Sequence, residues 1–379
     1  MYHPVGIRSL ALSVPNTIRT NDYFRNKYPE LIAQSEQRSL AKLFSLADST
    51  PNNEFDLEMM PYLSDPFRGT VERRVLAPDE SSLTLEYKAA KDALDAAKLS
   101  PDDVDLMIVA SLVGEQIIPG NAAALAGLLG LRGAAWNLDS MCSNAIVALQ
   151  NACALVRVGE YRNVLVVVSC TYSRLVDDRD TLSWFTGDGA GAFVIGSLKA
   201  DQGILGTKIV HTAETCGAFY TKLMQDTQGN ARLFLKTGKK ANKIISDIAV
   251  SSVRTCCEAA AAAASVTLDQ INFFAFNTPT AWYASLCTRV LNINPERTIN
   301  LYPQYGNIGP TLPIANLYHA AQLGKICEND LVLVYSIGSV SNAGAIVMRW
   351  GDVALGPAPV HEPDFAAKGA KDKSLVMAI

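Results

Sequence analysis

The chain has 379 residues, of which 49% are hydrophobic and 18% are charged, and its formal net charge is −4. This length predicts two domains or one large duplicated unit, and the apolar content excludes a disordered protein. The charge provides no basic surface for nucleic acid, and no apolar run approaches the roughly 18 residues of a membrane-spanning helix. The eight cysteines form no CxxC pair. We therefore expect no metal site and no disulfide framework, but a soluble protein of a reducing compartment, the cytoplasm.

The first hundred residues predict a strand, a covering segment and a helix. Residues 1–20 carry the apolar pattern of a strand, and the polar stretch 21–67 is irregular and helix-prone, so we interpret it as a cover over another part of the fold. Apolar spacing predicts a helix from Ser82 to Lys98, with a serine as the N-cap candidate. A turn then leads into a predicted buried strand over 106–112.

The stretch 136–160 predicts the end of a strand, a tight turn and a helix that begins at Cys142. Apolar residues recur at three- and four-residue steps after Cys142, and Gly159 is the expected helix stop. Unpaired N–H groups and the helix dipole stabilise a thiolate at such a position, so we expect a pKa below the roughly 8.5 of a free cysteine. The alternative is a buried cysteine that packs as a small hydrophobic side chain.

The second half of the sequence repeats the order of elements in the first. A predicted helix over 244–264 is followed by a turn and a buried strand, as is the earlier helix. Three strand segments match counterparts in the same order: 103–110 with 269–276, 163–170 with 330–337, and 189–196 with 342–349. These matches favour an internal duplication, although apolar strands resemble one another easily.

Strands and helices alternate in each half, and several strands are apolar on both faces. This pattern predicts sheets that helices cover on both sides. We therefore expect an α/β fold in which two βαβαβ halves stack into an α-β-α-β-α sandwich, with Cys142 near its centre. The halves are predicted at 1–200 and 201–354, with the boundary inside 197–206, and residues 355–379 are predicted to form a disordered tail.

Five segments together resemble the thiolase superfamily, and most closely 3-oxoacyl-carrier-protein synthase III and its condensing relatives. They are VERRVLAPDESS at 71–82, MCSNAIVAL at 141–149, FTGDGAGAFVIG at 185–196, YGNIGPT at 305–311 and YSIGSVSNAGAIVMRW at 335–350. The segments keep the family's order, and the resemblance extends over residues 3–350. It implies a thiolase fold and a ketosynthase-type acyltransferase, class EC 2.3.1, without a permanently bound cofactor.

The resemblance places the family's nucleophilic cysteine at Cys142. A thiolate there attacks the carbonyl of an acyl-CoA or acyl-carrier-protein thioester and forms an acyl-enzyme. Backbone N–H groups hold the oxyanion, and the family places them at Cys142 itself and near Ser339 or Val340. The Ser339-Val340-Ser341 turn is bulkier than the glycine-rich turn of related enzymes. We therefore expect a narrower pocket or a shifted turn.

Asn277 stands where the resemblance implies a catalytic histidine. FNTPT at 276–280 is similar to the histidine-centred segment of hydroxymethylglutaryl-CoA synthases, and Asn307 matches the asparagine that follows the histidine about 30 residues later. In the family, this pair binds the thioester carbonyl and stabilises the enolate left by decarboxylation. Asparagine donates a hydrogen bond to an oxyanion but takes up no proton at neutral pH. We therefore expect general-base catalysis by this residue to be lost.

Two other residues are candidates for the missing base. Glu115 lies on a loop that in the family reaches across the dimer, and a glutamate on that loop acts as the base in long-chain olefin-pathway condensing enzymes. His211 lies in a predicted loop that follows a strand of the second half. The alternatives are a solvated carboxylate for Glu115 and a surface or capping histidine for His211. On the same loop as Glu115, Ile117 and Ile118 are candidates for the acyl-pocket lining.

The resemblance also suggests where the acyl donor binds. Relatives use an aromatic residue and an arginine to hold CoA, and Phe67, Arg68 and Arg73 occupy this neighbourhood of the sequence. The expected partners are therefore acyl-CoA or an acyl carrier protein, a second small-molecule or acyl-thioester substrate, and a second copy of the chain in a homodimer. Neither nucleic acid nor a membrane is an expected partner.

Three functions remain open on the sequence. The first is an acyltransferase of specialised metabolism that passes the acyl group from Cys142 to a second substrate by Claisen-type C–C condensation, which the survival of Asn307 favours. The second is C–O or C–N acyl transfer to a small-molecule acceptor. The third is a non-catalytic subunit of a heteromeric condensing enzyme, against which the retention of Cys142 argues.

Overall fold

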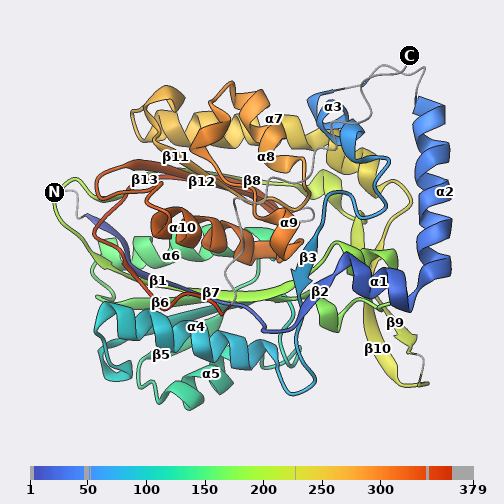
Figure 1. The fold of residues 1–379 in the computed structure, drawn as a ribbon. Coiled ribbons are helices and arrows are strands. Elements are labelled where there is room, and N and C mark those ends of the chain that lie inside the picture. The colour runs from blue at the N-terminus through green and yellow to red at the C-terminus, as the bar shows by residue number, and fades with distance from the viewer. Residues whose placement is uncertain (1–3, 47–50, 52, 227, 339–340, 361–379) are drawn as a thin grey trace.

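The computed structural model describes residues 4–46, 51, 53–226, 228–338 and 341–360. Its elements form five layers, which Figure 1 shows from the side. Two mixed sheets lie one above the other, with one pair of helices between them and one pair on each outer face. The predicted α-β-α-β-α architecture is therefore confirmed. In the described part of the chain, no helix combines the length and the apolar character needed to cross a membrane.

The two sheets differ in size but share a common arrangement of strands. The larger sheet has six strands in the order β14 (Ala354–Leu355), β1 (Val5–Ser13), β7 (Asp188–Ser197), β6 (Val164–Thr171), β4 (Leu106–Ser111) and β5 (Ala134–Asn137). The smaller has four strands in the order β8 (Gly203–His211), β13 (Asn342–Arg349), β12 (Leu331–Ile337) and β11 (Phe273–Phe276). In both sheets one parallel pair, β4–β6 or β11–β12, is followed by two antiparallel pairings. This shared topology is that of a duplicated unit.

The three helix layers cover both faces of both sheets. One outer layer holds α4 (Ser82–Ala97) and α5 (Asn121–Leu129), the central layer holds α6 (Asn144–Arg157) and α10 (Leu312–Gln322), and the other outer layer holds α7 (Ala241–Ala263) and α8 (Tyr283–Leu291). The helix α4 begins after Ser81, which caps it by accepting a hydrogen bond from the Thr84 N–H. The predicted helix start at Ser82 and the predicted serine cap are confirmed.

Strand alternation divides the core into a central cluster and two outer clusters. In β6, Val164, Val166 and Val168 face the central helices, whereas Leu165 and Val167 pack against the α4 side. The central cluster also contains residues of the second sheet, so both halves share it. The two sheets are consequently buried on both faces, as the apolar strands predict.

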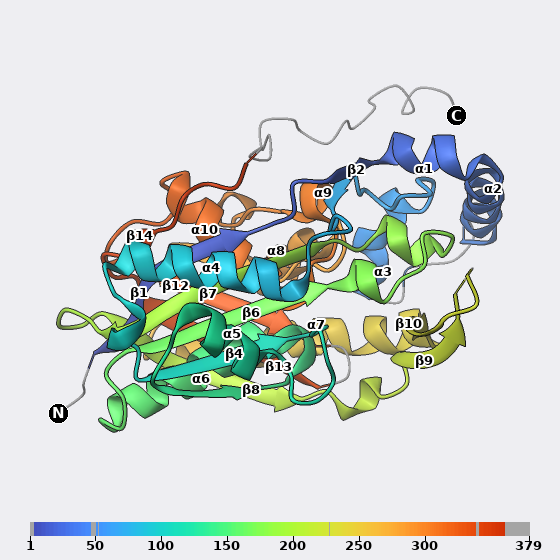
Figure 2. The same ribbon diagram turned by 90° about the horizontal axis from the view of Figure 1, so that it is seen from below.

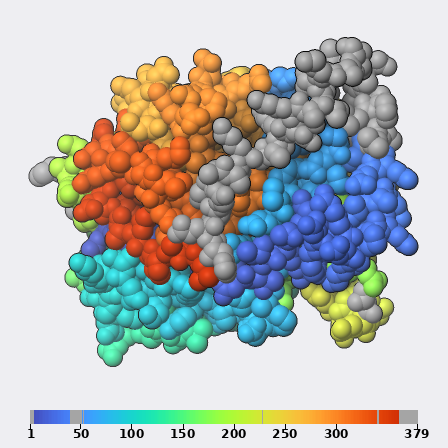
Figure 3. Space-filling view, viewed as in Figure 1, coloured from blue at the N-terminus to red at the C-terminus, as the bar shows by residue number. Residues whose placement is uncertain are grey.

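The segment 21–67 lies along one side of the molecule as α1 (Asn21–Lys27), α2 (Pro29–Leu46) and α3 (Glu54–Met59) (Figures 1 and 3). Phe55 on α3 packs edge-on against Trp282, with their ring centroids 5.9 Å apart. Phe24 on α1 packs against Trp184 at 6.2 Å. The segment therefore covers other parts of the fold, while its role as a cover of the active centre stays a prediction.

Two short hairpins complete the chain. One pairs β2 (Ile18–Thr20) with β3 (Glu72–Arg74), and the other pairs β9 (Phe219–Gln225) with β10 (Ala231–Thr237). The β9–β10 hairpin projects from the body, drawn in yellow in Figure 3 and also seen in Figure 2.

The predicted disordered tail begins too early. Leu355 pairs with Leu10 of β1, and the Gly356 N–H donates to the Leu10 carbonyl at 2.9 Å. The Tyr318 hydroxyl donates to the Gly356 carbonyl at 2.9 Å. The first residues of the predicted tail are thus ordered against the larger sheet, and its remainder, 361–379, lies outside the described residues. The proposed boundary at 197–206 stays a prediction.

Candidate active site

Cys142 lies in a 3₁₀ turn, Met141–Ser143, that immediately precedes α6. The helix begins at Asn144, two residues later than predicted, because the Asn144 side chain accepts a hydrogen bond from the Ser140 N–H and closes the turn. Met141, directly before the nucleophile, has a φ of 51°, a left-handed conformation that non-glycine residues rarely adopt. Strained backbone of this kind is concentrated at functional sites.

Cys142 is half-buried as a residue, and burial of its sulfur has the largest effect on the acidity of the thiol. Burial raises the pKa of the Cys142 thiol above its ordinary value, a hydrogen bond with Tyr172 lowers it, and the nearby Asp139 carboxylate raises it again. The net direction is upward, so the expectation of a lowered pKa is wrong. The reason is that loss of solvent around the sulfur outweighs the favourable position next to the helix start.

Asn277 is connected to Cys142 through Ser336. The Asn277 Nδ2 donates to Ser336 Oγ at 2.9 Å, and Ser336 Oγ donates to the Cys142 carbonyl at 2.7 Å. Both Asn277 and Ser336 are fully buried. A hydroxyl has one hydrogen, and the carbonyl can only accept it, so Ser336 must accept from the amide nitrogen of Asn277. This network fixes the orientation of the Asn277 amide, and no partner of its buried Oδ1 is found among the described residues.

Asn307 lies on the loop before a second 3₁₀ turn, Gly309–Thr311, that packs against the Cys142 turn. Its backbone is held on both sides, because its N–H donates to the Phe185 carbonyl at 2.7 Å and its own carbonyl accepts from the Gly187 N–H at 3.0 Å. Its Oδ1 accepts from the Gly309 N–H at 2.8 Å. With that oxygen engaged, the Asn307 Nδ2 is the group left to donate to a ligand.

The turn at 338–342 is tied to the residues around Cys142. Ser143 Oγ donates to the Asn342 carbonyl, Asn342 Nδ2 donates to Ser140 Oγ at 2.7 Å, and Ser140 Oγ lies 3.3 Å from Ser341 Oγ. The two predicted oxyanion-hole residues in this turn, Ser339 and Val340, lie outside the described residues. Their assigned role, like that of the Cys142 N–H, stays a prediction.

An apolar cluster adjoins the Cys142 sulfur. The Tyr172 hydroxyl lies 3.6 Å from Cys142 Sγ, and the Tyr172 ring packs with Cys170, Val176 and Leu235. Leu235 comes from β10, so the base of the projecting hairpin contributes to this cluster. Neither Tyr172 nor Ser336 was predicted from the sequence. The available signal was their position, because each lies at or directly after the end of a buried strand that leads toward the nucleophile.

The predicted bases lie in separate surroundings. Glu115 Oε1 accepts from both the backbone N–H and the hydroxyl of Ser82, at 2.7 Å each, so it caps the start of α4. His211 is the exposed last residue of β8 rather than a loop residue, and its Nδ1 accepts from the Ala213 N–H at 3.3 Å. These contacts match the alternatives of a surface carboxylate and a capping histidine. A catalytic role for either residue stays a prediction.

The predicted acyl-pocket residues Ile117 and Ile118 are each 83% exposed. They therefore line no pocket within one copy of the chain. Their predicted role requires a second copy, as the expected reach of this loop across a dimer implies.

The predicted donor-binding residues are buried or half-buried in the fold. Phe67 is fully buried against Trp184, with ring centroids 5.1 Å apart. Arg73 is also fully buried: its Nε donates to the Trp184 carbonyl at 3.1 Å and its Nη1 to the Arg19 carbonyl at 3.0 Å, and burial lowers its pKa to about 10. Arg68 is half-buried and donates to the Tyr62 carbonyl at 2.9 Å. These contacts stabilise the fold, and donor binding by the three residues stays a prediction.

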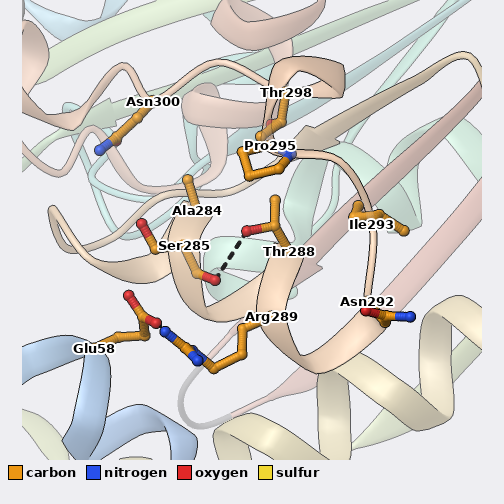
Figure 4. A pocket seen from close by; sticks show the side chains of 10 residues that line it. All are labelled: Glu58, Ala284, Ser285, Thr288, Arg289, Asn292, Ile293, Pro295, Thr298 and Asn300. Carbon is orange, nitrogen blue, oxygen red and sulfur yellow. Dashed lines mark hydrogen bonds and ion pairs between the residues drawn. The ribbon is translucent and has the colours of Figure 1, made fainter.

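A cavity of about 620 Å³ opens elsewhere on the molecule, between α3 and α8 (Figure 4). Its lining is mostly polar and consists of Glu58, Ala284, Ser285, Thr288, Arg289, Asn292, Ile293, Pro295, Thr298 and Asn300. The Arg289 guanidinium is paired with Glu58. Since this cavity contains neither a cysteine nor a histidine, it is not the candidate site for acyl transfer. Within the described residues, no three His, Cys, Asp or Glu side chains gather to hold a metal ion.

Family models match both halves of the chain. The model described as 3-Oxoacyl-[acyl-carrier-protein (ACP)] synthase III matches residues 137–213, and the model of the C-terminal part matches residues 261–350. The first range contains Cys142, and the second contains Asn277 and Asn307.

Whole-chain similarity extends these matches. The β-ketoacyl-[acyl-carrier-protein] synthase III of Listeria innocua is 30% identical over 304 residues, covering 78% of this chain and 94% of the relative. The corresponding protein of Rhizobium meliloti is 32% identical over 295 residues, covering 74% and 88%. The chain belongs to the 3-oxoacyl-carrier-protein synthase III family. As a member, it is an acyltransferase of the EC 2.3.1 type.

Solved structures show the same fold. The β-ketoacyl-carrier-protein synthase III of Thermus thermophilus has a TM-score of 0.73 at 26% identity and covers 92% of this chain and 99% of that one. The priming β-ketosynthase of the R1128 polyketide pathway has a TM-score of 0.75 at 20% identity, covering 93% and 97%. At this identity the second comparison establishes the fold alone, which is the thiolase-type fold of the family.

Proposed function

We propose that this chain is a condensing acyltransferase of specialised metabolism that carries its acyl group on Cys142. In the first step the Cys142 thiolate attacks the carbonyl of an acyl-CoA or acyl-carrier-protein thioester. The bond from that carbonyl carbon to the donor sulfur breaks, and the donor thiol leaves with the proton that Cys142 gave up. The observation that carries the proposal is the sulfur of the half-buried Cys142 in a fixed turn whose carbonyl is bonded to Ser336 of the other half.

In the second step, we assign the acyl group to a carbon nucleophile. A C–C bond forms to the acyl carbonyl carbon, and the bond from that carbon to Cys142 Sγ breaks and releases the thiolate. The Asn277 amide keeps one Nδ2 hydrogen beyond the one bonded to Ser336, and Asn307 Nδ2 is likewise a donor. Two such donors suit the enolate oxygen that forms when a malonyl-type thioester loses carbon dioxide. We infer that Asn277 replaces the family's histidine, so charge stabilisation is retained while proton transfer by this residue is lost.

Mass measurement of the intact protein after incubation with acyl-CoAs and acyl carrier proteins tests the first step. We expect an acyl adduct that is absent from Cys142→Ala. Cys153→Ala on the buried side of α6 is the matched control, because it removes another cysteine of the same helix and should leave the adduct intact. The absence of an adduct with every donor would contradict the proposal and favour a non-catalytic subunit.

A second candidate function is acyl transfer to oxygen or nitrogen. The Asn277 Oδ1 is buried and has no hydrogen-bond partner in the described structure. An unpaired buried acceptor costs about 1–3 kcal/mol unless a donor reaches it, and an attacking hydroxyl or amine would supply one. Product mass with an offered amine or alcohol, against that with malonyl-thioester, distinguishes this candidate from carbon–carbon bond formation.

We propose a homodimer formed at the β5 edge of the larger sheet. This edge strand is short and mostly exposed, and Trp136 on it is 39% exposed beside the exposed Ile117 and Ile118 loop. An unpaired strand edge flanked by apolar side chains favours pairing with another chain. Light scattering should give the mass of two copies, and Trp136→Lys should shift it toward one. A single-copy mass for the wild-type chain would contradict the dimer.

A further inference from the structure

We propose that Tyr172 is a catalytic hydrogen-bond donor that stabilises the thiolate form of Cys142 as this residue attacks the acyl donor. The inference rests on the proposed role of Cys142 as the nucleophile. Its starting point is the 3.6 Å separation of Tyr172 Oη and Cys142 Sγ, which is within hydrogen-bond distance for sulfur. The other half of the chain offers Asn277 at this site, and an amide carries no charge at any working pH.

The position of the Tyr172 hydroxyl is fixed by its own surroundings. The residue lies in the 3₁₀ turn Tyr172–Arg174 that follows β6, and its carbonyl accepts from the Leu175 N–H at 2.8 Å. The next residue, Ser173, donates through its N–H to Asp188 Oδ1 at 2.9 Å. The ring is buried and packs with Val176 and Leu235. The hydroxyl is therefore held at the sulfur before any substrate arrives.

The protonation state of Tyr172 makes it a donor rather than a base. Burial raises the pKa of Tyr172 well above its ordinary value, so the phenol keeps its hydrogen at neutral pH. A neutral phenol beside a thiolate can only donate, because the thiolate has no hydrogen to give. The proton of the Cys142 thiol leaves with the donor thiol during acyl loading, while the phenolic hydrogen stays on Tyr172.

Other groups around the sulfur oppose the thiolate. The negative charge of Asp139, just before the Cys142 turn, raises the pKa of the Cys142 thiol. Cys170, at the end of β6, is buried, and burial raises the pKa of its thiol well above the ordinary value, so it is a neutral neighbour of the sulfur. Burial itself disfavours the charged form. Two groups favour the anion by lowering the pKa of the Cys142 thiol: the Tyr172 hydroxyl, with the larger effect, and the backbone N–H of Cys142, with the smaller.

The test is the pH dependence of Cys142 alkylation by iodoacetamide, followed on the peptide that contains this cysteine. Only the thiolate reacts, so the midpoint of the rate profile reports the acidity of the thiol. In Tyr172→Phe we expect the midpoint to rise by about one pH unit, which is about tenfold slower alkylation below the midpoint. Tyr318→Phe is the matched control, because it removes another buried tyrosine hydroxyl with a hydrogen bond and should leave the profile unchanged.

An unchanged or lowered midpoint in Tyr172→Phe would overturn the proposal. If this variant fails to fold, 3-fluorotyrosine at position 172 provides the second measurement, because its more acidic hydroxyl donates more strongly and should lower the midpoint. A midpoint that does not fall there would equally overturn it. Alkylation needs no acyl donor, so these outcomes remain decisive for Tyr172 even if no donor ever acylates Cys142.

Discussion

The two halves of the molecule each contain an equivalent pair of parallel strands, β4–β6 and β11–β12, and the two pairs end in different residues. In the first half the residues that face the central layer at these ends are Ala110 on β4 and Val168 on β6, which are paired and apolar. In the second half the corresponding places after β11 and in β12 hold Asn277 and Ser336. At these strand ends, one half thus supplies apolar support for the nucleophile, and the other supplies polar groups that reach its turn.

The first half also has a polar pair, but on the opposite face. Ser111 and Ser169 both donate to the Glu86 carboxylate on α4, in the outer layer. There the buried polar groups tie a strand pair to a helix, whereas Asn277 and Ser336 tie a strand pair to the Cys142 turn. Polar residues on the outer face of a strand pair therefore support the fold, whereas polar residues on the central face support the reactive centre.

The largest expected effect comes from converting Asn277 into a group that can transfer a proton. Asn277→His should raise malonyl-thioester decarboxylation by about 10²–10⁴-fold, because imidazole takes up and delivers a proton at neutral pH. Loss of malonyl-CoA with time measures the effect. Asn151→His, on the exposed face of α6, should leave the rate unchanged. Unchanged or slower decarboxylation in Asn277→His would mean that the pocket is built for another reaction.

A smaller effect separates the two polar pairs, Ser111 with Ser169 and Asn277 with Ser336. Ser336→Ala removes the donor to the Cys142 carbonyl, so acyl loading should slow by about tenfold and the free energy of unfolding should fall by about 1–3 kcal/mol. Ser169→Ala should lower stability by a similar amount but leave loading unchanged, because it acts on Glu86. Quenched-flow mass measurement and denaturant unfolding give the two quantities. Equal loading rates in both variants would break the comparison.

The Glu86 carboxylate, which accepts from Ser111 and Ser169, should make the free energy of unfolding depend on pH. Burial raises its pKa above the ordinary value, although its hydrogen bonds oppose this. The folded state therefore binds the proton more tightly than the unfolded state, and stability falls as pH rises from the ordinary to the raised pKa. Glu86→Gln should lack this fall in denaturant unfolding. A constant offset is also expected, because the new NH₂ must face a donor. A difference between the two curves that does not change with pH would contradict this origin.

The smallest effect concerns Glu115. Glu115→Gln should lower the free energy of unfolding by about 0.3–1 kcal/mol, because the positive end of the helix dipole stabilises a carboxylate at the start of α4. Acyl loading and condensation should keep their rates. Condensation that fails while loading stays normal would instead support Glu115 as the base.

Much of the fold followed from periodicity, but the register of the duplication did not. The predicted match of 163–170 with 330–337 places Ser169 opposite Ser336. In the structure, Val168 is the residue of the first half that faces the central layer, and Ser336 reaches Cys142 from that same face. The strand match is therefore one residue out. Strands buried on both faces carry little alternation, so their sequence does not mark which side faces inward.

Only part of the candidate site could be predicted, because the sequence shows local patterns but not contacts between distant residues. Cys142 stands out because a helix pattern begins beside it, whereas Tyr172 resembles any residue after a buried strand. The burial of Arg73 was not predictable, because the carbonyls that hold its guanidinium come from distant parts of the chain. The pKa of Cys142 was misjudged because local position is visible in a sequence but solvent exclusion by the second half is not.

The hydrogen bond from Ser336 to the Cys142 carbonyl also has a consequence for the synthesis of the chain itself. The cysteine is translated long before residue 336, and its turn lacks this anchor until the later half has folded onto it. Domains fold in order as the chain emerges. A truncated or half-made chain would therefore carry the thiol without the geometry that directs it, and acyl thioesters would meet a reactive centre only on completed molecules.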